Sequence, residues 1–210
     1  MTGLNSHHLK LIAAVSMLLD HIGVVLYPEI DWLRMVGRIS FPLFAWLLVQ
    51  GEAHTRNVWR YGLRLGLLGL ISQPIYQIAF DVATLNILFH LLIGLVCLRT
   101  SRAQPKWTWP IWIAGGLIAE VLNISYGGYG IALILLLRYF RNRPRWWMAW
   151  VGLHLVSIPL FGTFQLPTLP VPFLWMAYNP QRGAKARWFY AFYPAHLLLL
   201  VLIHASGVYG

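Results

Sequence analysis

Charged residues are scarce in this sequence. Only 10% of its 210 residues are charged, and just six of these are acidic, whereas a soluble domain carries about 25% charged residues. Apolar residues make up 59% of the chain. This composition argues against a soluble domain. It predicts an all-α, polytopic integral membrane bundle that forms a single domain over residues 1–210.

Cysteine and the common catalytic motifs are also scarce or missing. The single cysteine, Cys97, lies in an apolar run, which excludes an internal disulfide framework. The sequence contains no HExxH, no Cys/His ligand spacing, no P-loop and no GxGxxG. We therefore expect no metal site and no dinucleotide-binding fold. No internal repeat suggests a transporter built from two halves.

Long apolar runs dominate what is present. Nine of them lie near residues 10–28, 33–51, 58–80, 85–98, 107–124, 128–140, 146–162, 169–179 and 188–206. The fourth, sixth and eighth runs are shorter than the ~20 residues that an ordinary span needs. The eighth is also rich in proline, so it could be re-entrant or broken. We expect eight or nine transmembrane segments, with the first run retained as a span.

The basic residues show which way the chain runs through the membrane. All but Arg34 and Arg38 of the 16 lie before the first run or in alternate connections. They are Lys10, Arg56, Arg60, Arg64, Arg99, Arg102, Lys106, Arg138, Arg141, Arg143, Arg145, Arg182, Lys185 and Arg187. The positive-inside rule then puts the N-terminus in the cytoplasm. Topology thus accounts for the net charge of +10, and we expect no nucleic-acid partner.

Two ionisable residues, Asp20 and His21, lie side by side in the first apolar run. Counted from Lys10, they fall roughly 15 Å into the run, close to the bilayer midplane. An ionisable residue there costs on the order of 2.5–3.5 kcal/mol by insertion scales. Because of this cost, ionisable residues within a membrane span usually indicate a functional site.

Arg34 and Arg38 are spaced i, i+4 and share one helix face. We expect Arg34 to reach the outer interface. Arg38 lies one turn deeper, and Asp20 is its obvious partner. The pair could form part of a site, or it could be a structural ion pair that pins the first two helices. At the other end of that run, a solvated helix end is the favoured interpretation of Glu52.

Six sequence blocks carry a family resemblance. They are LKLIAAVSMLLDHIG (9–23), GRISFPLFAWLLVQG (37–51) followed by HT (54–55), ISQPIY (71–76), LNILF (85–89), ISYGGYGIALILLL (124–137) and FYAFYPAHLLLL (189–200). With these blocks the chain resembles the TraX family of conjugative pilin acetylases and their bacterial relatives. Gln50 and His90 depart from the family pattern.

The resemblance implies a multi-pass acyltransferase of the bacterial inner membrane. Its donor would be cytoplasmic acetyl-CoA, and its acceptor an amine such as a processed pilin N-terminus. A glycan or a lipid headgroup is also compatible with a polar intramembrane site. The sequence leaves two other functions open: a small proton-coupled transporter and a non-enzymatic membrane assembly protein.

Acetyl transfer to an amine needs a base that takes the amine proton and hydrogen-bond donors that stabilise the oxyanion of the tetrahedral intermediate. It also needs residues that bind the CoA phosphates. We predict His21 as the base, with Asp20 and Arg38 as a supporting charge pair. The predicted acetyl-CoA-binding residues are Arg138, Arg141, Arg143 and His54. The predicted substrate-binding residues are Gln73, Asn86, Tyr126, Tyr129 and His196.

Overall fold

The computed structural model describes residues 3–179 and 188–207. Apart from two isolated β-bridges, all regular structure in these residues is helical, which confirms the expected all-α fold. The α-helices are α1 (Ser6–Val25), α2 (Asp31–Gly37), α3 (Ser40–His54), α4 (Val58–Phe80), α5 (Ile87–Ala103), α6 (Thr108–Val121), α7 (Gly127–Arg138), α8 (Pro144–Val156), α9 (Ile158–Phe161), α10 (Pro172–Met176) and α11 (Phe189–Ala205). Two 3₁₀-helices are η1 (Pro105–Trp107) and η2 (Gly162–Thr168).

Three helical stretches of the described chain are long and apolar enough to cross a membrane. They are Ser6–Val25, Asp31–His54 and Pro144–Thr168. Shorter apolar helices, α7 and α11 among them, accompany these three. The composition of the helices therefore supports a membrane protein.

The proline-rich eighth run is broken, as its sequence predicts. Of its residues 169–179, only Pro172–Met176 form a helix, the five-residue α10, and the helix before them, η2, ends at Thr168. Pro167 lies inside η2, and Pro172 is at the start of α10. Because proline lacks the N–H of a regular helix and clashes with the preceding turn, a continuous helix cannot form here.

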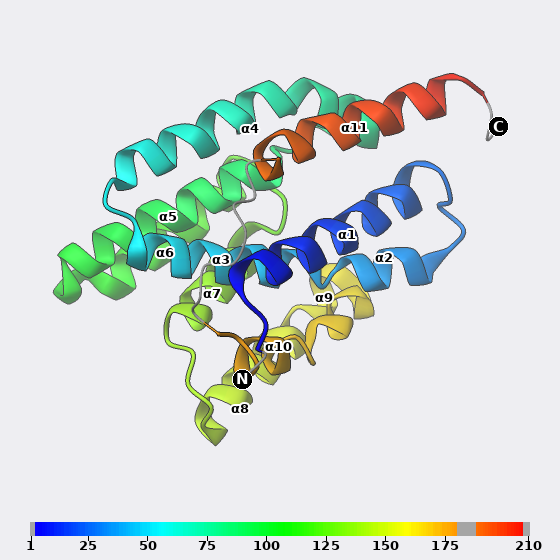
Figure 1. Ribbon diagram of the computed structural model, residues 1–210. Helices are drawn as coiled ribbons and strands as arrows, with labels where there is room; N and C mark the ends of the chain where they lie inside the picture. Colours follow the sequence, from blue (N-terminus) through cyan, green and yellow to red (C-terminus); the bar gives the residue numbers. More distant parts are fainter. Residues whose placement is uncertain (1–2, 180–187, 208–210) are drawn as a thin grey trace.

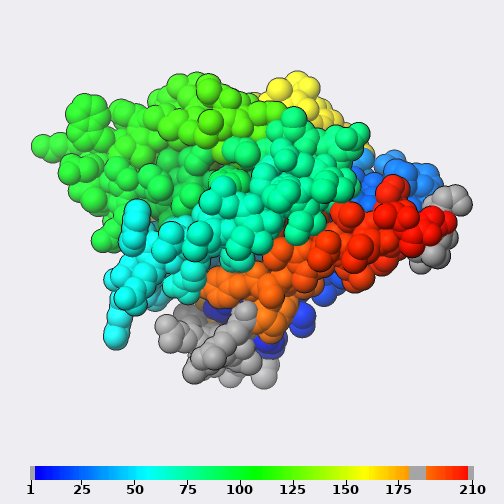
Figure 2. Space-filling model, turned by 90° about the horizontal axis from the view of Figure 1, so that it is seen from above, coloured from blue at the N-terminus to red at the C-terminus, as the bar shows by residue number. Residues whose placement is uncertain are grey.

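Helix α3 lies in the centre of the bundle and contacts α1, α5 and α7. In Figure 1, α4 and α11 run side by side along one edge, and Figure 2 shows the same two helices together on one face. The interior is filled by large apolar side chains with almost no exposure. These include Leu43, Leu48, Leu95, Leu98, Leu133 and Ile134.

The outer surface of the bundle is apolar as well. Val121 on α6, Val156 on α8 and Ile78 on α4 are 84%, 74% and 69% exposed. A soluble protein covers such helix faces with polar side chains. Here the exposed apolar side chains match the hydrocarbon that surrounds a membrane helix.

Helices α1 and α2 approach each other unusually closely at Gly37. A Cβ atom at this position would lie only 2.1 Å from the Cβ of Asp20. Only glycine therefore fits at this position. The close approach of the two backbones lies next to the residues that form the Asp20–Arg38 ion pair.

Candidate functional site

Helix α1 places Asp20 and His21 nearer to one end than the sequence suggests. The helix begins at Ser6 because the side chain of Asn5 caps it by accepting from the backbone N–H groups of His7 and His8. Asp20 is consequently about 21 Å from the first residue of α1 and about 7 Å from the last, Val25. Counted over the whole helix rather than from Lys10, the two residues lie in its last two turns.

The expected Asp20–Arg38 ion pair is present. Arg38 Nη2 lies 3.0 Å from Asp20 Oδ1, and the two side chains are only 16% and 14% exposed. Arg38 also donates through Nη1 to the Tyr126 hydroxyl at 3.2 Å. The Tyr126 ring stacks on Phe41 with a centroid separation of 4.3 Å. Three segments distant in sequence therefore supply one connected polar group.

His21 faces a different neighbour, as expected for adjacent residues ~100° apart on a helix. Its Nδ1 lies 2.7 Å from Nε2 of His196 on α11. Both side chains are buried, and the Phe80 ring of α4 packs edge-on against His21 at 4.8 Å. The structure thus joins His196, predicted to bind substrate, directly to the predicted base.

Gln73 and Asn86 bind each other. Gln73 Oε1 accepts from the backbone N–H and the side-chain amide of Asn86, at 3.0 and 2.8 Å. The Asn86 amide also donates to the Gly69 carbonyl, and its oxygen caps α5 at Leu88. These bonds tie α4 to the start of α5.

Tyr129 lies one turn beyond Tyr126 on α7, and their ring centroids are 6.4 Å apart. Its ring is buried against Phe161 and His154 at 5.5 and 5.9 Å. It is therefore a neighbour of the Asp20–Arg38–Tyr126 group through Tyr126.

The predicted acetyl-CoA-binding residues lie at the opposite end of the bundle. His54 ends α3 about 24 Å along the helix direction from Arg38. Arg138 ends α7, where it donates to Ser101 and lies over the Tyr139 ring at 5.3 Å. Arg141 and Arg143 are exposed in the connection that follows. The exposed guanidinium groups of Arg141 and Arg143 have the planar donor geometry that matches phosphate.

Glu52 differs from its sequence-based interpretation. Its side chain is fully buried and accepts from Arg102 Nη2 at 2.8 Å, while Arg99 Nη1 lies 3.9 Å away. The sequence predicts a solvated helix end, but the C-terminal ends of α3 and α5 pack together and enclose the carboxylate. The i, i+3 spacing of Arg99 and Arg102 is the signal that could have suggested a buried acid opposite them.

The glycine-rich turn before α7 holds a carboxylate of the protein itself. Glu120 Oε1 accepts from the backbone N–H of Gly128 at 2.6 Å. A Cβ at Gly127, whose φ is +47°, would lie 2.3 Å from the same oxygen. The start of α7 therefore binds an anion, and that anion is the carboxylate of Glu120.

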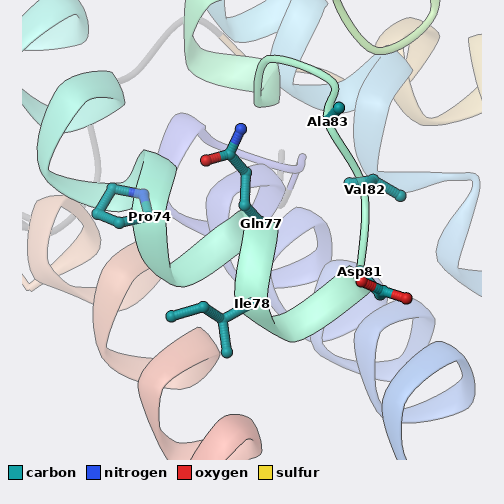
Figure 3. A pocket seen from close by; sticks show the side chains of 6 residues that line it. All are labelled: Pro74, Gln77, Ile78, Asp81, Val82 and Ala83. Carbon is teal, nitrogen blue, oxygen red and sulfur yellow. The ribbon is translucent and has the colours of Figure 1, made fainter.

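An open surface pocket lies at the end of α4 (Figure 3). It is lined by Pro74, Gln77, Ile78, Asp81, Val82 and Ala83. Phe80, within the same turn of α4, packs against the His21 ring. The pocket therefore opens near the end of the bundle that carries His21. In the described part of the chain no group of three His, Cys, Asp or Glu side chains could hold a metal ion.

Comparison with known proteins extends over most of the chain. The model of the family described as "TraX protein" matches residues 5–204. A probable fimbrial assembly protein, FimC of serogroup H1 from Dichelobacter nodosus, is 31% identical over 93% of this chain and 94% of its own length.

Two further relatives match over shorter regions. Protein TraX of Escherichia coli is 32% identical over 65% of this chain and 57% of its own length. An uncharacterized protein of Rickettsia prowazekii is 34% identical over 41% of this chain and 33% of its own length. No solved structure matches. The family match covers nearly every helix described above, including those that carry Asp20, His21, Arg38 and His196, and the chain belongs to the TraX family.

Proposed function

We propose that this protein is a membrane-embedded acetyltransferase of the bacterial inner membrane. It would transfer an acetyl group from cytoplasmic acetyl-CoA to an amine such as a processed pilin N-terminus. The observation that carries the proposal is the buried His21–His196 pair, adjacent in sequence to the Asp20–Arg38–Tyr126 group. Ionisable residues among apolar helices are costly and mark functional sites. Membership of the TraX family supports the acetyl transfer.

In this proposal eight unbroken helical segments cross the membrane, and η2 with α10 forms a ninth, broken crossing that returns the chain to the side of the N-terminus, where Tyr178 pairs with Leu4. The N-terminus and the ends of α3, α5 and α7 face the cytoplasm, because the basic residues gather there. The ends of α1 and α4 face outward. The site formed by Asp20, His21 and Arg38 then lies nearer the outer surface, while the exposed Arg141 and Arg143 lie on the cytoplasmic side.

His21 acts as the general base of the proposed reaction. The acceptor nitrogen forms a bond to the acetyl carbonyl carbon while His21 takes a proton from that nitrogen. The C–S bond then breaks, and the CoA thiolate leaves and receives the proton. The products are an amide and free CoA thiol, so the histidine is unchanged after one turnover.

Arg38 and Tyr126 stabilise the negative charge that develops on the carbonyl oxygen. Tyr126 accepts a hydrogen bond from Arg38, so its own hydroxyl hydrogen remains available to donate. Asp20 holds Arg38 in place at 3.0 Å. Removing one donor from a site of this kind typically costs about 10²–10³ in kcat.

Arg138, Arg141, Arg143 and His54 bind the acetyl-CoA phosphates in this proposal. The apolar side chains of α3, α5 and α7 fill the space between these residues and Arg38. We therefore propose that the donor arm reaches His21 along α1, α4 and α11. Gln73, Asn86 and Tyr129 contribute to the wall on the acceptor side.

The function is tested by measuring thiol release from acetyl-CoA with the purified protein in nanodiscs and an amine acceptor peptide. Wild type should release thiol, and His21→Ala should not, although it inserts and folds. His204→Ala is the matched control, because His204 is an exposed histidine near the end of α11. Release by His21→Ala at the wild-type rate would refute His21 as the base.

The name of the Dichelobacter relative favours one alternative, a non-enzymatic role in fimbrial assembly. The same experiment separates the two proposals. A protein that neither binds acetyl-CoA nor releases thiol, yet restores fimbriae as wild type and as His21→Ala, would be an assembly protein.

A further inference from the structure

His196 makes two short hydrogen bonds, one through each ring nitrogen. Nε2 lies 2.7 Å from His21 Nδ1, and Nδ1 lies 2.6 Å from the backbone carbonyl oxygen of Phe192, one turn earlier on α11. The His21 and His196 planes are inclined by only 14°, with centroids 5.0 Å apart. That separation matches the 2.7 Å bond plus one ring radius on either side. The rings therefore meet edge to edge, as an in-plane N–H···N bond requires.

The carbonyl of Phe192 determines where every proton of this pair sits. A carbonyl oxygen can only accept, so His196 Nδ1 must carry a hydrogen. In a neutral imidazole the other nitrogen is then an acceptor, and His196 Nε2 must accept from His21. His21 Nδ1 is consequently the donor, which leaves the lone pair of His21 on Nε2.

We infer that His196 is a positioning residue, which fixes His21 in the Nδ1–H tautomer and so makes Nε2 the atom that reacts. The reactive role of Nε2 rests on the proposed function. The tautomer of His21 does not, because it follows from the hydrogen bonds alone. This role differs from the substrate-binding role that the sequence suggests for His196. It also gives a reason why α11 packs against α1 at this level.

The arrangement also provides for the proton that His21 collects. Once Nε2 has taken a proton from the acceptor amine, His21 Nδ1 can pass its own proton to His196 Nε2. His196 then carries the charge, with Nδ1–H still bonded to Phe192, and His21 is neutral. The reverse transfer returns the proton when the CoA thiolate leaves. Each step breaks one N–H bond and forms another, so no co-reactant is needed.

The tautomer is tested directly by ¹⁵N NMR of histidine-labelled protein in nanodiscs, with His21→Gln used to assign the His21 signals. We expect His21 to show a protonated Nδ1 and an unprotonated Nε2. His196→Leu should shift His21 toward the Nε2–H form that free imidazole side chains prefer, and His204→Leu, on the same helix, should not. A protonated Nε2 on neutral wild-type His21 would overturn the inference.

Turnover gives the second measurement. His196→Leu should lower kcat by about 10²-fold with an unchanged KM for the amine, because general-base catalysis is lost while substrate contacts remain. His196→Gln, which keeps an acceptor, should recover part of the rate. A raised KM with unchanged kcat would show instead that His196 contacts substrate. Absence of turnover in wild type would refute the acetyltransferase proposal, and the NMR measurement would still decide the role of His196.

Discussion

At the residue scale, the Asp20–Arg38 pair illustrates how a charge persists among apolar helices. Both side chains are mostly buried, and each compensates the other. Removing one partner of such a pair leaves an uncompensated charge, whereas replacing both is often tolerated. The pair can therefore be structural, catalytic or both, and the two contributions can be measured separately.

A double-mutant cycle separates them. Asp20→Asn and Arg38→Gln should each lower the stability of the protein in detergent, and the double variant should recover most of that loss. The expected coupling is about 0.5–3 kcal/mol, as for residues in direct contact. Thermal unfolding in detergent measures it. In the proposed enzyme, turnover stays low in the double variant. Recovery of turnover together with stability would show that the pair only holds the helices.

Gly37 is the second residue that matters at this scale. Gly37→Ala places a methyl group 2.1 Å from the Cβ of Asp20, so α1 and α2 must separate. Overpacking of this kind typically costs about 1–3 kcal/mol. We expect a lower unfolding temperature and reduced acetyl transfer. Gly152→Ala on α8 is the matched control, since a Cβ there meets nothing within 4 Å. Equal stability of the two variants would contradict the close helix contact.

At the element scale, Glu52 joins α3 to α5 at the end of the bundle opposite to His21. Its carboxylate is fully buried and depends mainly on Arg102, because Arg99 is 3.9 Å away. The burial of this carboxylate differs from the solvated helix end that the sequence predicts. A glutamate directly after the last residue of an apolar run (33–51) is expected to be solvated unless a neighbouring helix covers it.

Arg102→Ala should therefore destabilise the α3–α5 contact more than Arg99→Ala. Loss of the partner of a buried acceptor costs roughly 1–3 kcal/mol. Chemical denaturation in detergent, with both variants compared to wild type, provides the measurement. If the two variants unfold alike, then Glu52 does not depend on Arg102 in the way that the 2.8 Å contact indicates.

At the scale of the whole molecule, the distribution of charge predicts how the protein lies in the membrane. Basic residues follow α3, α5 and α7, while Asp81 follows α4 at the other end. The topology can be tested by cysteine labelling, because Cys97 is the single cysteine of the chain and is buried. When Cys97 is replaced by alanine, a cysteine introduced elsewhere is the only site that a thiol reagent can label.

We expect Asp81→Cys to react with a membrane-impermeant thiol reagent in spheroplasts. Asn142→Cys, in the connection between α7 and α8, should react only after the cells are lysed. Both positions are exposed in the structure. A difference in their reactivity toward the reagent would therefore report the side of the membrane on which each position lies. The opposite pattern of labelling would overturn the proposed orientation and place the predicted acetyl-CoA-binding arginines outside the cell.

The sequence by itself determined the helical class, the broken eighth element and the partnership of Asp20 with Arg38. Each follows from short-range rules: apolar length, proline chemistry, and the cost of an unpaired charge among apolar side chains. The tertiary structure decided the His21–His196 bond and the burial of Glu52. Residues 175 positions apart meet only through the packing of α1 against α11. No periodicity within either helix specifies that contact, because it depends on which helix faces which.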